Sequence, residues 1–328
     1  MAYVRRRLAV AIAAAICGLF GVVSGGIAGD FPSRTLNFVV PFGAGGASDV
    51  MTRVIAQKLA ENVGRPAVVE NRPGGGGQIA AQYVMSAPAD GHTIWVVDTS
   101  HVVINPSLYS KLQYDPTKDF AAVMRVANTS LFMAVGASVP VHSVKELIDH
   151  ARANPGLMYG SSGNGSVHHL GMELFKSLTG VNMTHVPYKG LSQSLPALVG
   201  GEISVLLGAL PALAPHVKTG KVRLLAVVGA GKREPSMPDV PTIAEAGVGG
   251  YEIDVDVGML VRADTRPDVV ASLNAEIARA LRAPEVVDRL AGYGFEVVSS
   301  SPEAFAEWIR ARIPKYGKLV RNSGARVD

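Results

Sequence analysis

The chain has 328 residues, of which 48% are hydrophobic and 18% are charged, and this composition fits a globular protein large enough for two domains. The formal net charge is +4, but three of the 31 basic residues are arginines within residues 1–28, which hold no acidic residue. The rest of the chain has 28 basic against 27 acidic residues, which argues against a nucleic-acid-binding protein with a clustered basic surface.

The N-terminal segment is typical of an export signal. Three consecutive arginines at 5–7 precede an apolar run at Leu8–Val23, and Gly26–Ala28 places small residues where a signal peptidase reads them. We expect cleavage near Ala28 and a periplasmic mature protein, with an uncleaved membrane anchor as the alternative. The only cysteine, Cys17, lies in this segment, so the mature chain would have neither a disulfide nor thiol chemistry.

After this segment, short apolar strands alternate with amphipathic helices, a pattern that predicts an α/β fold with mostly parallel sheets. The first cycle has a glycine-rich turn between its first strand and its first helix, and we expect Ser48 or Asp49 to cap that helix. The predicted elements of this cycle are strands at 35–40, 67–70 and 93–97 and helices at 48–62 and 78–86.

A second cycle of strands and helices begins near Leu131. Ser143 and Glu146 have the spacing of a capping box at a helix start, and three C-terminal helices each have a proline near their start, where the missing N–H costs little. The predicted elements are strands at 131–135, 157–160, 182–186, 203–207 and 222–228 and helices from 144, at 167–178, 267–281, 284–290 and 302–318.

We expect the chain to pass twice between two domains, near Asn128 and near Tyr251. Domain one would then comprise residues 29–128 and 252–328, and domain two residues 129–251. Two such crossovers form a hinge, and a ligand would lie in the cleft between the domains, at the carboxyl ends of the strands.

Two glycine-rich turns, at 41–49 and 159–166, stand where a strand is followed by a helix. Glycine allows the backbone to approach a ligand closely, because it has no Cβ atom and tolerates positive φ. The first turn of a helix has N–H groups without partners and a partial positive charge, so it binds anions. Two such turns in different halves of the chain predict a site that holds a small anion between the domains.

Six sequence strings spread over the mature chain occur together and in order. They are Pro41–Gly46 with Asp49, Val69–Gly74, Asp90–Thr93, Tyr114–Pro116 with Asp119 and Phe120, His185–Gly190, and Asp239–Thr242 with Glu245–Gly247. Together they resemble the Bug-type receptors, the extracytoplasmic solute-binding proteins of tripartite tricarboxylate transporters. The resemblance implies a two-domain periplasmic-binding-protein fold of type II, a monomer that closes on a small organic acid and delivers it to integral-membrane permease subunits.

The resemblance also implies that backbone N–H groups and ordered waters hold the ligand's carboxylate. The implied contacts in domain one are Phe42, Ala44, Gly45, Gly46, Ser48 and Asp49. Those in domain two are Ser161, Ser162, Gly163, Asn164, Gly165 and Ser166, with Tyr188 and Lys189 nearby. Two departures from the family pattern, Gly208 in place of a frequent aspartate and Asp256 in a stretch that often carries a tryptophan, are expected to reshape the far end of the pocket.

Other classes of function have weaker support in the sequence. Gly43 and Gly45 have the first spacing of a dinucleotide fingerprint, but Ser48 stands at the third glycine position. We find no motif for a nucleophile, a general base or a metal, so we expect neither an enzyme nor a cofactor; a metal pair of His169 and His185 is disfavoured. A sensor that acts on a membrane signalling partner stays open, as does the identity of the acid.

Overall fold

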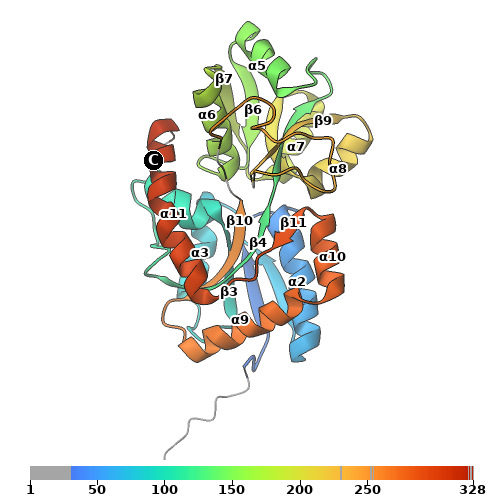
Figure 1. The fold of residues 1–328 in the computed structure, drawn as a ribbon. Coiled ribbons are helices and arrows are strands. Elements are labelled where there is room, and N and C mark those ends of the chain that lie inside the picture. The colour runs from blue at the N-terminus through green and yellow to red at the C-terminus, as the bar shows by residue number, and fades with distance from the viewer. Residues whose placement is uncertain are drawn as a thin grey trace, which may run out of the picture.

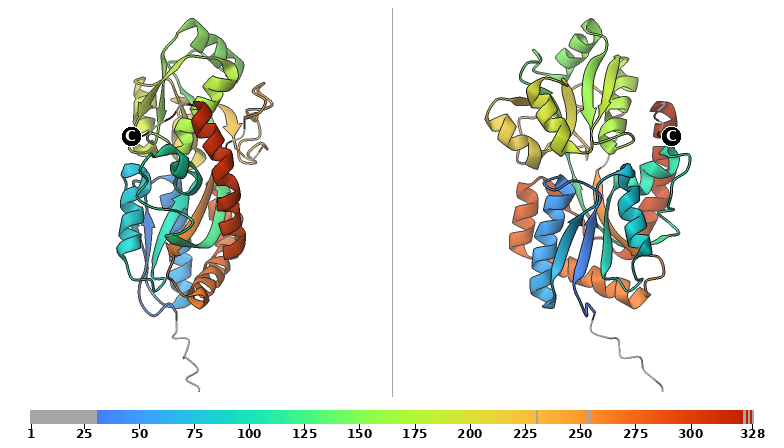
Figure 2. Two further views of the ribbon diagram at one scale, coloured as in Figure 1. Left: turned by 90° about the vertical axis from the view of Figure 1, so that its left-hand side faces the viewer. Right: turned by 180° about the vertical axis from the view of Figure 1, so that it is seen from behind.

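The computed structural model describes residues 31–229, 231–251, 253, 255–323, 325 and 327. The expected export signal at residues 1–28 lies outside the described residues. Two β-sheets, each covered by helices, form two lobes (Figures 1 and 2), so the predicted α/β class is confirmed. Within the described part of the chain, no helix is long and apolar enough to cross a membrane.

The first lobe is built on a six-stranded sheet with the order β11-β4-β10-β3-β1-β2. Its strands are β1 (Leu36–Val40), β2 (Ala67–Asn71), β3 (Thr93–Asp98), β4 (Phe120–Thr129), β10 (Asp256–Arg262) and β11 (Phe295–Val297). Its helices are α2 (Ala47–Val63), the 3₁₀ turn η1 (Gly75–Gly77), α3 (Gln78–Ser86), the π-helix η2 (Ser100–Ile104), α4 (Asn105–Leu108), α9 (Pro267–Leu281), α10 (Pro284–Gly292) and α11 (Pro302–Ser323).

Alternating side chains of these strands build two cores, because successive residues of a strand point to opposite faces of the sheet. Phe38 and Ile94 belong to the core under α2, α9 and α10. Val39 and Trp95, one residue further along the same strands, belong to the core under α3, α4 and α11. The first sheet is therefore buried on both faces.

The second lobe is built on a five-stranded sheet with the order β7-β6-β8-β5-β9. Its strands are β5 (Leu131–Gly136), β6 (Leu157–Ser161), β7 (Met183–Pro187), β8 (Val205–Ala209) and β9 (Val222–Val228), and its helices are α5 (Val144–Ala153), α6 (Val167–Thr179), α7 (Leu191–Gly200) and α8 (Leu210–Lys218). Residues of α5 and α6 pack on one face, with Met133, and those of α7 and α8 on the other, with Phe132.

The sheets are mixed, which differs from the expectation of mostly parallel strands. Pairs β1–β2, β1–β3, β6–β7 and β6–β8 are parallel, but every described pairing of β4, β5 or β10 is antiparallel. The reason is the crossing itself: β4 leads out of the first lobe and β10 returns to it, so these neighbours run in opposite directions, with Asn128 opposite Asp256. The sequence analysis did not predict β4, β10 or β11.

The chain changes sheets between Thr129 and Leu131 and again between Val228 and Asp256. Both changes lie close to the expected domain boundaries. That these boundaries separate two folding units stays a prediction. The prediction of β8 was displaced by two residues, since the strand is Val205–Ala209.

Two predicted helix starts have different outcomes. The cap at Ser143 is confirmed, because Ser143 Oγ accepts a hydrogen bond of 3.1 Å from the Glu146 N–H, while the Glu146 carboxylate accepts from the His142 N–H. The cap expected at Ser48 or Asp49 is wrong, because α2 begins at Ala47 and its N-cap residue is Gly46, two residues before Ser48.

The C-terminal helix α11 lies along one side of the molecule and contacts both lobes (Figures 1 and 2). It packs against β4, η2 and α4 of the first lobe and against α6 of the second. Tyr316 of α11 and Phe175 of α6 are both fully buried and belong to one continuous apolar core. The two lobes are therefore joined along this side by more than the two crossing segments.

Candidate ligand-binding cleft

The helix α2 begins at the first glycine turn without a side-chain cap. Its N-cap residue, Gly46, is extended, with φ −72° and ψ 166°, and no side chain caps the N–H groups of the first helical turn. Ala47 and Ser48, the first two helical residues, line a cleft between the lobes. Because the first N–H groups of a helix have no partner within it, those of α2 are available to an acceptor in the cleft.

The helix α7 begins in the same way on the opposite wall of this cleft. Gly190 is its N-cap residue, with φ 138° and ψ 170°, and again no side chain caps the helix. The N–H groups of Gln193 and Ser194 donate to the Gly190 carbonyl, which leaves those of Leu191 and Ser192. These two residues and Gly190 line the cleft, so two uncapped helix starts, one from each lobe, meet at one place.

The cleft encloses about 610 Å³ of space, part of it open to solvent. Its lining residues are Phe42, Gly43, Gly46, Ala47, Ser48, Asp98, Thr129, Leu131, Ser162, His168, Gly190, Leu191, Ser192, Ala209, Val255 and Val257. Most of these side chains are apolar or small, and the described part of the lining contains one carboxylate and neither lysine nor arginine. A ligand here would therefore meet backbone donors and apolar surface.

A second hollow adjoins the cleft, with a volume of about 810 Å³. Phe42 and Ser162 line both spaces, so they mark the passage between them. The other lining residues are Pro41, Gly74, Gly75, Gly76, Gly77, Ser100, His101, Asn105, Tyr109, Gly163, Asn164, Ser166, Tyr188 and Lys189. Several of these residues are exposed, so this hollow is the more open of the two.

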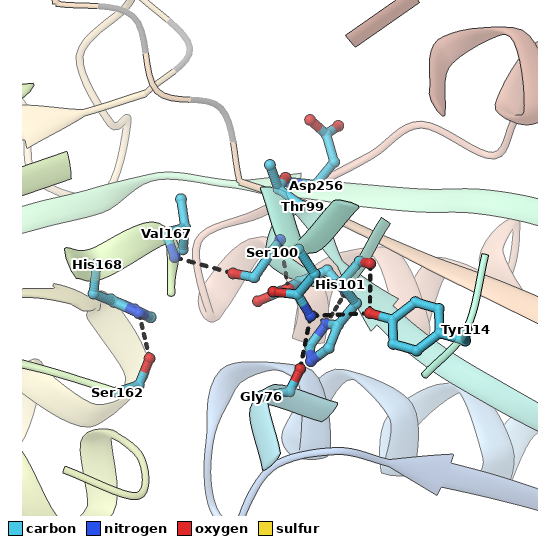
Figure 3. Close-up of polar contacts among 11 residues, drawn as sticks. Gly76, Thr99, Ser100, His101, Tyr114, Ser162, Val167, His168 and Asp256 are labelled. Atoms are coloured by element: carbon cyan, nitrogen blue, oxygen red, sulfur yellow. Dashed lines mark hydrogen bonds and ion pairs between the residues drawn. The ribbon is translucent and has the colours of Figure 1, made fainter. Parts of the chain in front are cut away.

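Protein groups already satisfy much of the start of α6, the helix after the second glycine turn. The Ser166 Oγ accepts a hydrogen bond of 3.2 Å from the His169 N–H. The Val167 N–H donates across the lobes to the Ser100 Oγ at 3.0 Å (Figure 3). The turn at 159–166 was expected to supply backbone donors, but the second-lobe helices that begin at the cleft without a side-chain cap are α7 and α8, whose N-cap residues Gly190 and Ala209 line it.

The structure divides the expected ligand contacts into three groups. Those that line the cleft are Phe42, Gly46, Ser48 and Ser162. Those that line only the adjoining hollow are Gly163, Asn164, Ser166, Tyr188 and Lys189. Those that line neither space are Ala44, Gly45, Asp49, Ser161, Gly165, Gly208 and Asp256.

Asp49 and Ser161 instead hold the two glycine turns in shape. The buried Asp49 carboxylate accepts hydrogen bonds of 2.9 Å from the Gly45 N–H and from Asn71 Nδ2, and it pairs with Arg53. Burial alone would raise the pKa of Asp49, but these donors outweigh it and lower the pKa below its ordinary value. The Ser161 hydroxyl lies 2.6 Å from His185 Nε2 and bonds to the backbone of Gly163.

Gly208 and Asp256 are not among the residues that line the cleft. A Cβ atom on Gly208 would contact Leu206, Leu213 and Leu191, so this position faces the core under α7 and α8, beside the cleft residue Leu191. The Asp256 carboxylate forms an ion pair of 3.0 Å with Arg125, while Val255 and Val257 on either side of it line the cleft. The far end of the cleft is thus shaped by the neighbours of the two expected residues.

Several cleft residues were missed by the sequence analysis, above all Asp98, His168 and the start of α7. The Ser162 hydroxyl lies 2.7 Å from His168 Nδ1 (Figure 3). Burial lowers the pKa of His168 to about 4, so this ring is neutral at pH 7. Gly190 is the last residue of the string His185–Gly190, and a glycine there could have indicated a helix start. Asp98 had no sequence signal beyond its place at the end of a strand.

Behind the second glycine turn, three aromatic rings form a stack. The rings of His169 and His185 lie 3.9 Å apart with an interplanar angle of 11°, and Tyr159 stacks on His185. His169 Nδ1 accepts a hydrogen bond of 3.0 Å from the Gly165 N–H. Stacked rings direct their nitrogen lone pairs in parallel planes, and no group of three or more metal-ligating side chains is found among the described residues.

Two α/β lobes, a cleft between them and two uncapped helix starts that face the cleft define a solute-binding protein of the periplasmic-binding-protein architecture. Residues 51–325 match the family described as "Tripartite tricarboxylate transporter family receptor", and the chain belongs to this family. It is thus a solute receptor rather than an enzyme. Within the family, it is 30% identical to the protein BugT of Bordetella pertussis, over 95% of this chain and 98% of BugT, which confirms the Bug-type resemblance.

Further relatives extend this similarity to solved structures. A protein encoded in the tcbD–tcbE intergenic region of Pseudomonas sp. strain P51 is 35% identical, over 88% of this chain and 86% of its own. The structure of R. palustris Rpa4515 with adipate has a TM-score of 0.87 and 38% identity, over 90% of this chain and 100% of that one. MatC from Rhodopseudomonas palustris with bound malate has a TM-score of 0.83 and 32% identity, over 88% and 100%.

Proposed function

We propose that this receptor captures a small carboxylate in the cleft by closure of the two lobes. The observation that carries the proposal is the convergence of two uncapped helix starts, α2 and α7, from opposite lobes. Each offers N–H donors and the positive end of a helix dipole, which bind an anion without a formal positive charge. An anion held by both favours the closed arrangement, because the open one offers it only one of the two.

We further propose that the mature protein begins near Ala28, works in the periplasm as a monomer and presents its ligand to integral-membrane permease subunits. Membership of a transporter-receptor family supports this role. Adipate and malate, bound in the two related structures, are both carboxylates, and this supports the proposed ligand class. Which acid binds is to be determined by a ligand screen.

The first test is a thermal-shift screen of the mature protein against mono- and dicarboxylates of three to eight carbons, including adipate and malate. A ligand that binds only the folded protein raises its stability by about 2.7 kcal/mol at a hundredfold excess over Kd. We expect a clear shift with at least one acid. A well-folded, ligand-free sample that responds to none of them would contradict the proposal.

The second test removes single backbone donors. Proline is tolerated at the first position of a helix but has no N–H, so Ala47→Pro and Leu191→Pro each delete one proposed donor. A hydrogen bond to a charged group contributes about 1.5–3 kcal/mol, so each change should weaken the Kd for the acid found in the screen about 10- to 150-fold. Isothermal titration calorimetry measures the loss.

The matched control is Val144→Pro, at the first position of α5. Its N-cap residue, Ser143, is extended, with φ −145° and ψ 162°, as the residue before a proline must be, and Val144 lines neither the cleft nor the adjoining hollow. Binding should be unchanged in this control. Equal losses in all three variants would mean that proline acts through the fold rather than through the cleft.

A further inference from the structure

One acidic side chain, Asp98, lies in the wall of the cleft. It is the last residue of β3, the parallel neighbour of β1, so it ends at the same edge of the sheet as the first glycine turn. It lines the cleft although it is only 6% exposed. A buried carboxylate is costly unless it is paired or hydrogen-bonded, so its partners determine what it can do.

The described partners of Asp98 bind only one of its two oxygens. Oδ1 accepts a hydrogen bond of 2.8 Å from the Ser100 N–H, and His101 Nδ1 lies 2.7 Å from the same atom. Neither of these contacts involves Oδ2, and the residue lines the cleft. Burial raises the pKa of Asp98, but His101, His168 and the Ser100 N–H together outweigh it and keep the pKa below its ordinary value, so the group is ionised at neutral pH.

The rest of the lining sets the environment of this charge. Among the described residues that line the cleft there is neither lysine nor arginine, and the other titratable group is the neutral ring of His168. Leu131, Val255 and Val257 supply apolar surface beside it. A second carboxylate of a ligand would therefore meet the Asp98 carboxylate without a cation between them, whereas a hydrogen-bond donor would complete its coordination.

We propose that the ligand is a carboxylate with an apolar body and one hydrogen-bond donor, a hydroxyl or an ammonium group, that binds Asp98 Oδ2. This rests on the proposed function, since α2 and α7 hold the ligand's own carboxylate. Asp98 then acts as the specificity residue: it selects against a plain dicarboxylate and for a hydroxy- or amino-substituted monocarboxylate.

The test compares four series of straight-chain acids of three to eight carbons: unsubstituted, hydroxy-substituted, amino-substituted and dicarboxylic. Isothermal titration calorimetry gives the Kd for the wild-type protein and for Asp98→Asn, which keeps the shape of the side chain and removes its charge. In the wild type, the best hydroxy or amino acid should bind at least about tenfold more tightly than the matching unsubstituted and dicarboxylic acids, as expected for one charge-assisted hydrogen bond.

The variant should reverse this order for charged ligands. Asp98→Asn should weaken an amino acid about tenfold or more, weaken a hydroxy acid less because the amide oxygen still accepts, and strengthen a dicarboxylate about tenfold. The control Asp90→Asn removes a partly exposed carboxylate that pairs with Arg34 outside the cleft and should leave the order unchanged. The two substituted series distinguish an ammonium from a hydroxyl donor.

The outcomes separate this inference from the function on which it rests. If no acid of any series binds the wild type, the proposed function fails. If a plain dicarboxylate binds the wild type most tightly, the function stands and the role of Asp98 is refuted, whether or not the variant folds. If the variant folds and its order of preference equals that of the wild type, the role of Asp98 is likewise refuted.

Discussion

The hydrogen bond between Ser100 and Val167 leads to a quantitative prediction, because it joins the two lobes beside the cleft. The Val167 N–H is the first of α6, the residue is fully buried, and the Ser100 Oγ is its acceptor at 3.0 Å. Ser100→Ala would leave this N–H buried without a partner, at a cost of about 1–3 kcal/mol. We expect the free energy of unfolding to fall by this amount.

The control makes the same chemical change where water can replace the lost partner. Ser143→Ala removes the hydroxyl that accepts from the Glu146 N–H, but this contact is exposed, and the loss of such a cap costs typically about 1 kcal/mol. Urea unfolding of both variants should therefore show the larger loss for Ser100→Ala. Ligand affinity, measured by calorimetry, should change less than about twofold in both, because we expect the Ser100 contact to persist whether or not ligand is bound.

The reasoning would be refuted if Ser100→Ala changed ligand affinity instead of stability. If Ser100→Ala left the stability unchanged and weakened the ligand tenfold or more, the contact would form only in the ligand-bound arrangement. The two lobes would then part along α6 as well as across the cleft.

Two further predictions concern the second lobe. Burial lowers the pKa of His169 to about 4 and that of His185 to about 3; since an unfolded chain takes up these protons near pH 6.5, the free energy of unfolding should fall as the pH drops from about 6.5 to about 3. Urea unfolding at several pH values measures this, and a profile equally steep in a variant with both histidines changed to glutamine would contradict it. Gly165→Ala should destabilise the protein more than Gly180→Ala: both positions have positive φ, but only at Gly165 would the new Cβ atom meet Leu108. Equal losses in thermal unfolding would show that Leu108 yields freely.

Local signals account for the parts of the fold that the sequence predicted. The first glycine turn follows the apolar strand β1 and precedes α2; the start of β1 was placed within one residue, and the cap of α2 two to three residues too late. The strands β4 and β10 were missed, because they pair with segments more than 120 residues away and β4 alternates irregularly between buried and partly buried residues. Long-range pairing leaves little trace in a short window of sequence.

The candidate site shows the same limit at the level of single side chains. The prediction named Asp256 and Gly208, but their neighbours Val257 and Ala209 line the cleft. Because successive residues of a strand point to opposite faces, a register uncertain by one residue exchanges the residues in a pocket for those behind it. Phe42, Gly46 and Ser48 were placed in the cleft because a turn and a helix start, rather than a strand register, position them.

The helix α11 determines from which side the cleft can admit a molecule. It packs against α6 on one flank of the protein, while α2 and α7 lie on the other (Figure 1). Separating the lobes on the flank of α11 would bring the buried side chains of Phe175 and Tyr316 into water. On the opposite flank the two lobes approach each other at small residues such as Gly43 and Ser192. The lobes would therefore rotate about a hinge along α11 and α6, and a ligand would enter from the opposite flank, beside the starts of α2 and α7.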